Sequence, residues 1–162
     1  MRDAFLRRDL WDALANLRED AAPRWGRMSA LQMVEHLSWV FHMSTGLAPV
    51  ACLVPEGRRQ RFKTLLHDDS EMPRQFRNPA LAAGLPPTRH EGLEAAIATL
   101  RVDVARFLDQ CRDAPAAVHT HPVFGPLDAD EWSRSHFKHV YHHLLQFGLV
   151  HAVSVDGVSP EP

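Results

Sequence analysis

Residues 91–112 have apolar side chains three and four positions apart. In a helix these side chains would share one face, whereas in a strand they would be divided between both faces. The charged side chains at Arg101, Asp103, Arg106 and Asp109 face away from this stripe. The pattern predicts an amphipathic helix over about Glu91 to Arg112. Its apolar positions are Leu93, Ile97, Leu100, Val104, Phe107, Leu108 and Cys111.

Three more stretches have helical periodicity. The first covers about Asp3 to Glu19. The second begins at Ser29, where Ser-x-x-Gln is typical of a capping box, and continues to about Thr45. The last opens at Asp128 with Asp-x-x-Glu and runs to about Val153. No period-two apolar alternation is long enough to predict a sheet.

The segment 47–90 holds half of the chain's 12 prolines, and only Arg58 to His67 in it has a short helical pattern. A connection of this length is expected where the chain travels the length of a bundle before the next helix. We therefore predict an all-α fold, an up-down four-helix bundle with a long crossover between the second and third long helices. Residues 1–162 are expected to form a single domain.

Composition excludes several classes of protein. The formal net charge is −2 and the basic residues form no long block, which argues against nucleic acid as a partner. No apolar stretch approaches the roughly 20 residues that span a bilayer, so no membrane association is expected. Cys52 and Cys111 lie far apart and outside any CxxC motif, which favours a reducing, cytoplasmic location.

The last predicted helix is rich in histidine. His139 and His143 lie about 40° apart around the axis and one turn apart along it, so both imidazoles can bind one ion. Apolar residues occupy the helix's other directions, which makes this a polar seam on a buried helix. The pair alone is weak evidence, because two such histidines can instead cap carbonyls or face water.

A third histidine, His36, points with the apolar stripe of the second predicted helix, whereas His42 points with its polar side. A hydrogen-bonded core histidine is the alternative interpretation of one inward imidazole. If His36 meets the pair on the last helix, three neutral imidazoles with an open fourth position resemble a catalytic rather than a closed structural metal site. Such ligands suit several divalent metals, with zinc or nickel favoured here.

Other polar residues are secondary candidates. His121 could act as a general base or transient ligand, or could simply bond backbone in a loop. His136 and His142 border the seam as candidate outer partners of the ligands. Gln146 could bond a ligand, a substrate or a helix carbonyl.

Two stretches resemble the DinB-like (YfiT-like) superfamily. One is PRWGRMSALQMVEHL at residues 23–37, and the other joins HPVFGPLDADEW at 121–132 to KHVYHHLLQFG at 138–148. The second is similar to one branch of the superfamily, known mainly as a domain of unknown function. The resemblance implies a four-helix bundle with a metal triad of His36, His139 and His143. It also implies a homodimer and a low-molecular-weight thiol as a candidate second cofactor.

Two functions follow as hypotheses. The first is a metal-dependent enzyme, thiol S-transferase-like or hydrolase-like, acting on a small-molecule substrate that the sequence does not identify. The second is a non-catalytic helical bundle in which the histidine site supports folding or dimerisation. The common superfamily form has Arg directly after the paired histidines, where this chain has Leu144, so the superfamily's substrates need not transfer.

Overall fold

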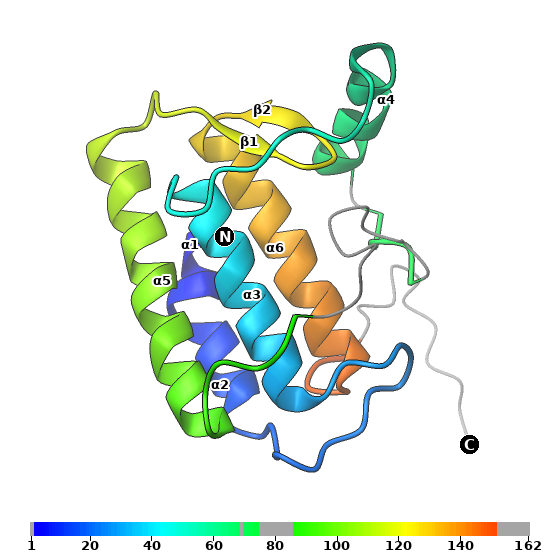
Figure 1. Ribbon diagram of the computed structural model, residues 1–162, viewed down its shortest axis with the longest axis vertical. Coiled ribbons are helices and arrows are strands. Elements are labelled where there is room, and N and C mark those ends of the chain that lie inside the picture. Colours follow the sequence, from blue (N-terminus) through cyan, green and yellow to red (C-terminus); the bar gives the residue numbers. More distant parts are fainter. Residues whose placement is uncertain (1, 69, 75–85, 152–162) are drawn as a thin grey trace, which may run out of the picture.

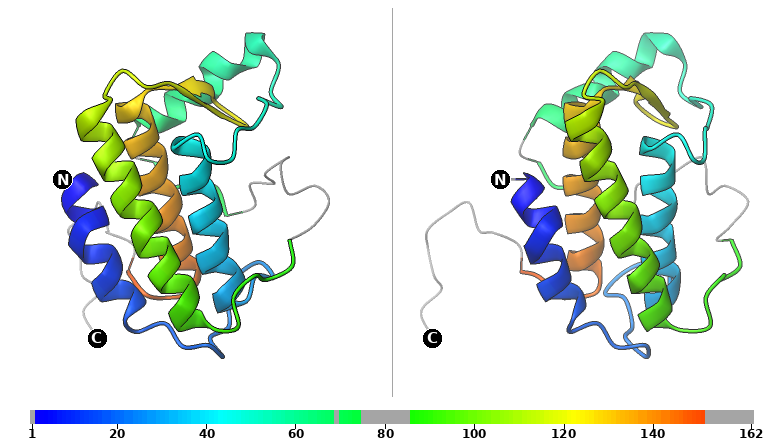
Figure 2. Two further views of the ribbon diagram at one scale, coloured as in Figure 1. Left: turned by 60° about the vertical axis from the view of Figure 1, so that its left-hand side comes forward. Right: turned by 90° about the vertical axis from the view of Figure 1, so that its left-hand side faces the viewer.

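Helices dominate the structure, a computed structural model that describes residues 2–68, 70–74 and 86–151. Figures 1 and 2 show an N-terminal helical rod side by side with α3 (Ala30–Ser44), α5 (Leu93–Asp113) and α6 (Ala129–Gln146). The chain runs in one direction along α3 and α5 and in the opposite direction along the other two. The N-terminal rod consists of α1 (Arg2–Ala4), η1 (Phe5–Asp9) and α2 (Leu10–Leu14) in succession.

The two predicted capping boxes are confirmed. Ser29 Oγ accepts from the Gln32 amide at 3.1 Å, and the Gln32 side chain accepts from the Ser29 amide at 3.0 Å. Asp128 and Glu131 form the same reciprocal pair at the start of α6. Each box satisfies two backbone N–H groups that a helix start leaves free, so α3 and α6 begin where the sequence indicates.

Two predicted helix ends were wrong. The first rod stops at Leu14 rather than Glu19, because the Asn16 and Leu17 amides donate to carbonyls three residues back and tighten the chain into a turn. Helix α6 stops at Gln146 rather than near Val153. Gly148 there adopts φ +70°, and the Gly148 and Leu149 amides bond the Leu145 and Leu144 carbonyls, which is a Schellman motif.

The prediction of no sheet was also wrong. Strands β1 (His119–His121) and β2 (Gly125–Leu127) form a short antiparallel hairpin, with His121 opposite Gly125. Each strand has three residues, too few for alternation to reveal it. The hairpin lies across one end of α3 and α6 (Figure 1), and it places His121 beside the interior of the molecule.

The described part of the crossover contains one helix, α4 (Glu56–His67), which confirms the helical pattern predicted at Arg58 to His67. Lys138 of α6 holds the end of α4 by donating to the Leu65 carbonyl, to Asp68 Oδ1 at 2.7 Å and to the Ser70 carbonyl at 3.0 Å. The crossover is thereby fixed against α6 near the middle of that helix. None of the described helices is long and apolar enough to cross a bilayer.

The core fills the space between the rods, and α3 packs most extensively on α5. One prediction about α5 was wrong: Asp103 does not face away from the protein but is only 3% exposed. It accepts from Ser38 Oγ, from His42 Nε2 at 3.0 Å and from Arg106 at 2.9 Å. The largest fully buried side chains are Trp132, Phe41, Phe107, Leu6, Leu10, Leu14, Met33, Leu37, Met43, Leu100, Leu127 and Leu144.

The Asp103 cluster gives the first test. We expect Asp103→Asn to lower the free energy of unfolding by about 2 kcal/mol, because hydrogen bonds to a charged group weaken and an amide N–H₂ then faces donors. Asp109→Asn is the matched control, since Asp109 is exposed on the same helix and, among the described residues, pairs only with Arg112. Urea denaturation at pH 7 measures both. Equal stabilities of the two variants would contradict the role given to Asp103.

Candidate metal centre

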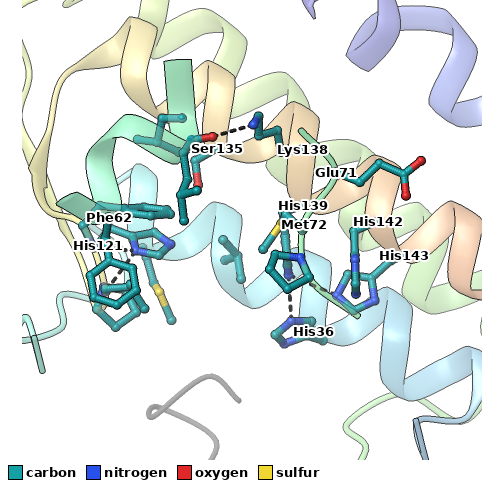
Figure 3. A pocket seen from close by; sticks show the side chains of 18 of the residues that line it. His36, Phe62, Glu71, Met72, His121, Ser135, Lys138, His139, His142 and His143 are labelled. Atoms are coloured by element: carbon teal, nitrogen blue, oxygen red, sulfur yellow. Dashed lines mark hydrogen bonds between the residues drawn. The ribbon is translucent and has the colours of Figure 1, made fainter. Parts of the chain in front are cut away.

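Three histidine side chains from two helices converge in the interior, as the sequence predicted. His36 comes from α3, and His139 and His143 come from successive turns of α6 (Figure 3). His139 Nε2 lies 3.0 Å from His36 Nε2 and 3.1 Å from His143 Nε2. The three candidate ligand atoms all lie within 4.8 Å of one another. A three-histidine cluster that could hold a metal ion is therefore present.

The proton on His143 is fixed by a chain of hydrogen bonds. The Gln146 side-chain N–H₂ donates to the Trp25 carbonyl at 2.7 Å, which leaves Gln146 Oε1 facing His143 Nδ1 at 2.7 Å. Because an amide oxygen can only accept, His143 Nδ1 must carry the proton. A neutral His143 therefore presents an Nε2 lone pair to the cluster, which is what a metal ligand requires.

The arrangement of nitrogens fits a cation better than it fits hydrogen bonds. A neutral imidazole nitrogen has either one proton or one lone pair, so His139 Nε2 can satisfy only one of its two close neighbours. Among the described residues, His139 Nδ1 is buried with no hydrogen-bond partner. Ligands 2.0–2.1 Å from a tetrahedral ion lie about 3.3 Å apart, close to the spacing of the two nearest pairs here.

Burial keeps these imidazoles neutral. It lowers the pKa of His36 from 6.5 to about 4, with a smaller contribution from the nearby His142. It also holds the pKa values of His139 and His143 well below 6.5, and the neighbouring histidines lower them further. Neutral imidazole is the form that binds metals, so the cluster is ready for a metal ion at neutral pH.

The cluster opens onto a pocket with a cavity volume of about 150 Å³. Its walls are mostly apolar side chains from α3, α4, the hairpin and the segment after α4. His121 lies at the end away from the histidine cluster (Figure 3). A molecule in this pocket can reach the three imidazoles without crossing the core. The apolar lining residues include Val40, Met43, Phe62, Leu65, Met72 and Val123.

The secondary candidates occupy different places. Gln146 orients His143, as described above. His142 is partly buried, lines the pocket and packs edge-on against Trp25, with ring centroids 5.6 Å apart. His136 lies in the core, stacked on Phe41 at 3.8 Å, where its Nε2 bonds Ser44 Oγ at 2.8 Å.

Sequence reasoning missed the residues that build the far wall of the pocket. Phe62 and Leu65 of α4 and Met72 beyond it line the cavity, and Lys138 holds that wall in place. Their only local signal was the short helical pattern in the crossover. Nothing in the sequence around them indicates which helices α4 faces.

Comparison with known proteins assigns the family. The model of the family described as "Protein of unknown function (DUF1569)" matches residues 8–148. The chain belongs to this family. The matched range of this DUF1569 protein contains all three clustered histidines, Gln146 and the hairpin. Comparisons with curated proteins and with solved structures found no match.

Proposed function

We propose that this DUF1569 protein binds one divalent metal ion through His36, His139 and His143 and acts as a metal-dependent enzyme on a small molecule. The observation that carries the proposal is the convergence of three Nε2 atoms on the wall of an apolar pocket. Three protein ligands leave a coordination position for water or substrate, as in catalytic sites. Zinc and nickel are the favoured ions.

In this proposal, the protein's own side chains orient the metal ligands and exclude water. Gln146 fixes the His143 ring through its Nδ1 proton, and the pocket's apolar side chains keep bulk water from the cluster. A bound divalent ion supplies positive charge that lowers the pKa of a water or thiol ligand and polarises a carbonyl. Both thiol transfer and hydrolysis are compatible with that chemistry.

Further parts of the proposal concern classification and assembly. We propose a single DinB-like domain formed by a four-helix bundle, supported by the four adjacent rods and by the long connection that lets α3 and α5 run in the same direction. We propose a homodimer and a low-molecular-weight thiol cofactor from the resemblance, and a cytoplasmic location from the two distant cysteines. Light scattering of the purified protein tests the dimer, and calorimetric titration of the metal-loaded protein with small thiols tests the thiol.

Metal analysis tests the proposed function. After reconstitution with zinc or nickel and removal of excess ion, we expect about one equivalent in the native protein and less than about a tenth in His143→Ala. A screen of thioester, amide and thiol-transfer substrates follows on the loaded protein. Stoichiometric metal with no turnover or small-molecule binding, together with a much lower melting temperature on metal removal, would favour the structural alternative.

A glycine beside the cluster gives a second test. Gly26 adopts φ +83°, and an added Cβ would lie 2.7 Å from Gln146 Nε2. We expect Gly26→Ala to lower stability by roughly 1 kcal/mol. By displacing the amide that orients His143, it should also weaken metal affinity about tenfold.

The control for Gly26→Ala is Gly57→Ala in α4. An added Cβ at Gly57 meets nothing within 4 Å, so this variant should keep both stability and metal affinity. Competition with a chromogenic chelator measures affinity, and urea denaturation measures stability. Unchanged metal affinity in Gly26→Ala would show that the Gln146 contact does not orient His143.

A further inference from the structure

The pocket has a second polar end that the proposed metal site does not use. His121 of the hairpin lines the cavity opposite the histidine cluster (Figure 3). Its ring packs against the rings of Phe124 and Trp132, with centroids 4.5 and 5.2 Å away. A ring fixed in this way presents one defined edge to the pocket.

Backbone hydrogen bonds determine which nitrogen of His121 carries the proton. The amides of Val123 and Phe124 donate to His121 Nδ1 at 3.1 and 3.3 Å. Because Nδ1 accepts these bonds, a neutral ring must carry its proton on Nε2. None of the described residues accepts a hydrogen bond from Nε2, which is the nitrogen on the pocket side of the ring (Figure 3).

His121 is consequently a donor rather than a base. Burial lowers the pKa of its imidazole to about 3, so the ring stays neutral at ordinary pH. Its lone pair is engaged by the backbone, and its free edge offers only an N–H. The general-base role that the sequence suggested for His121 needs a lone pair on the pocket side, which this tautomer does not have.

The charged lining residues give a substrate no strong ionic partner. Of the described residues around the cavity, Lys138 and Glu71 are charged. Lys138 Nζ already bonds Asp68 and two carbonyls, and Glu71 is exposed. The interior of the pocket therefore favours an uncharged, largely apolar small molecule.

Size and length restrict the molecule further. A closed apolar cavity of about 150 Å³ accommodates a molecule the size of benzene, and the cavity here has a volume of about 150 Å³. Trp132, which contacts His121, precedes His139 by seven residues on α6, a rise of about 10 Å along the helix. A single ring with only a small group at each end comes nearest to both limits.

We propose that the pocket takes an uncharged, single-ring or similarly sized apolar molecule, oriented at one end by a hydrogen bond from His121 Nε2–H to its carbonyl or other acceptor. An atom at the opposite end of the molecule binds the metal as a ligand, and that part rests on the proposed function. His121 is thus a specificity and positioning residue that selects molecules with an acceptor remote from the reacting end.

The His121 end can be tested without metal. In metal-free protein, long-range ¹H–¹⁵N NMR should show His121 protonated on Nε2 and unprotonated on Nδ1. Acetophenone should move the Nε2–H proton resonance downfield by accepting a hydrogen bond. Ethylbenzene, which has a similar shape but no acceptor, should not cause this downfield shift. A proton on Nδ1, or equal responses to the two probes, would overturn the proposal even if the metal site is correct.

The whole pocket is tested with metal bound. On cobalt-substituted protein, 4-acetylbenzenethiol should bind about five to ten times more tightly than benzenethiol, the effect of one added hydrogen bond. His121→Asn is the matched variant, because Asn Oδ1 can accept from the Val123 and Phe124 amides but its side chain cannot reach as far as Nε2. It should retain metal and benzenethiol binding and lose the preference for the acetyl compound.

The outcomes separate the two proposals. A protein that binds no cobalt but shows the acetophenone response refutes the metal proposal and supports the role of His121. A protein that binds cobalt and both thiols equally, or a His121→Asn variant that keeps the preference, refutes the role of His121 and supports the metal site. Visible absorption of the thiolate–cobalt complex gives both affinities.

Discussion

His139→Ala is expected to lose stoichiometric metal binding while keeping its helical circular dichroism. His139 Nε2 lies next to both other Nε2 atoms, so its removal leaves only two of the three proposed ligands. Removing an outer hydrogen-bond partner typically costs about 10- to 100-fold in affinity, and removal of a ligand itself should cost more. Equilibrium competition with a chelator measures the loss.

The control for this variant is His136→Phe, on the same helix one turn earlier. His136 is fully buried, but it stacks on Phe41 and bonds Ser44, so phenylalanine should fill its place without touching the cluster. This variant should bind metal like the native protein. Equal losses in the two variants would mean that general disruption of α6, and not loss of a ligand, abolishes binding.

Acid is expected to unfold the metal-free protein at unusually mild pH. His36 and His121 have pKa values lowered from 6.5 to about 4 and about 3, and those of His136, His139 and His143 lie well below 6.5, in each case chiefly through burial. The unfolded chain therefore binds more protons than the folded one below pH 6.5, and stability falls as the pH falls.

The expected loss is several kcal/mol, because each such group contributes up to about 1.4 kcal/mol per pH unit below 6.5. The free energy of unfolding should have its full value above pH 6.5 and decline progressively toward pH 4. For a domain of ordinary stability, half of the molecules should be unfolded near pH 5. Urea denaturation of the chelator-treated protein at steps from pH 7.5 to 4.5 measures this slope.

Histidine 136 again gives the control. His136→Phe removes one buried titrating ring without changing the shape of the core, so the slope of stability against pH should decrease by about 1.4 kcal/mol per unit. A free energy of unfolding that is constant between pH 7.5 and 5 would contradict the neutral, buried state of the histidines.

The histidine cluster was predictable because each helix carried its own evidence. His139 and His143 share a face by spacing alone, and the place of His36 in the apolar stripe of its helix favoured an inward ring. The convergence of the two helices was not derivable from periodicity and was implied by the resemblance. The two capping boxes were predictable for a simpler reason: both partners lie within four residues.

The errors have two physical causes: dependence on distant partners, and local structure too short for hydrophobic periodicity to reveal. Asp103 looks like a surface charge on its own helix, and only Ser38 and His42 of α3 make its burial possible. The hairpin forms from three-residue strands that pair only because their turn permits it. Both wrong helix ends also have local causes: a tight turn ends the first rod, and Gly148 was a local signal for the end of α6 that the continuing apolar pattern concealed.

A crystal of the zinc-loaded protein, with data collected on both sides of the zinc absorption edge, tests the metal centre most directly. We expect one anomalous peak in the interior, bonded to Nε2 of His36, His139 and His143 at 2.0–2.1 Å, with its remaining position facing the pocket. No peak at that point, or zinc held by other residues, would contradict the proposed metal centre and the metal-dependent function built on it.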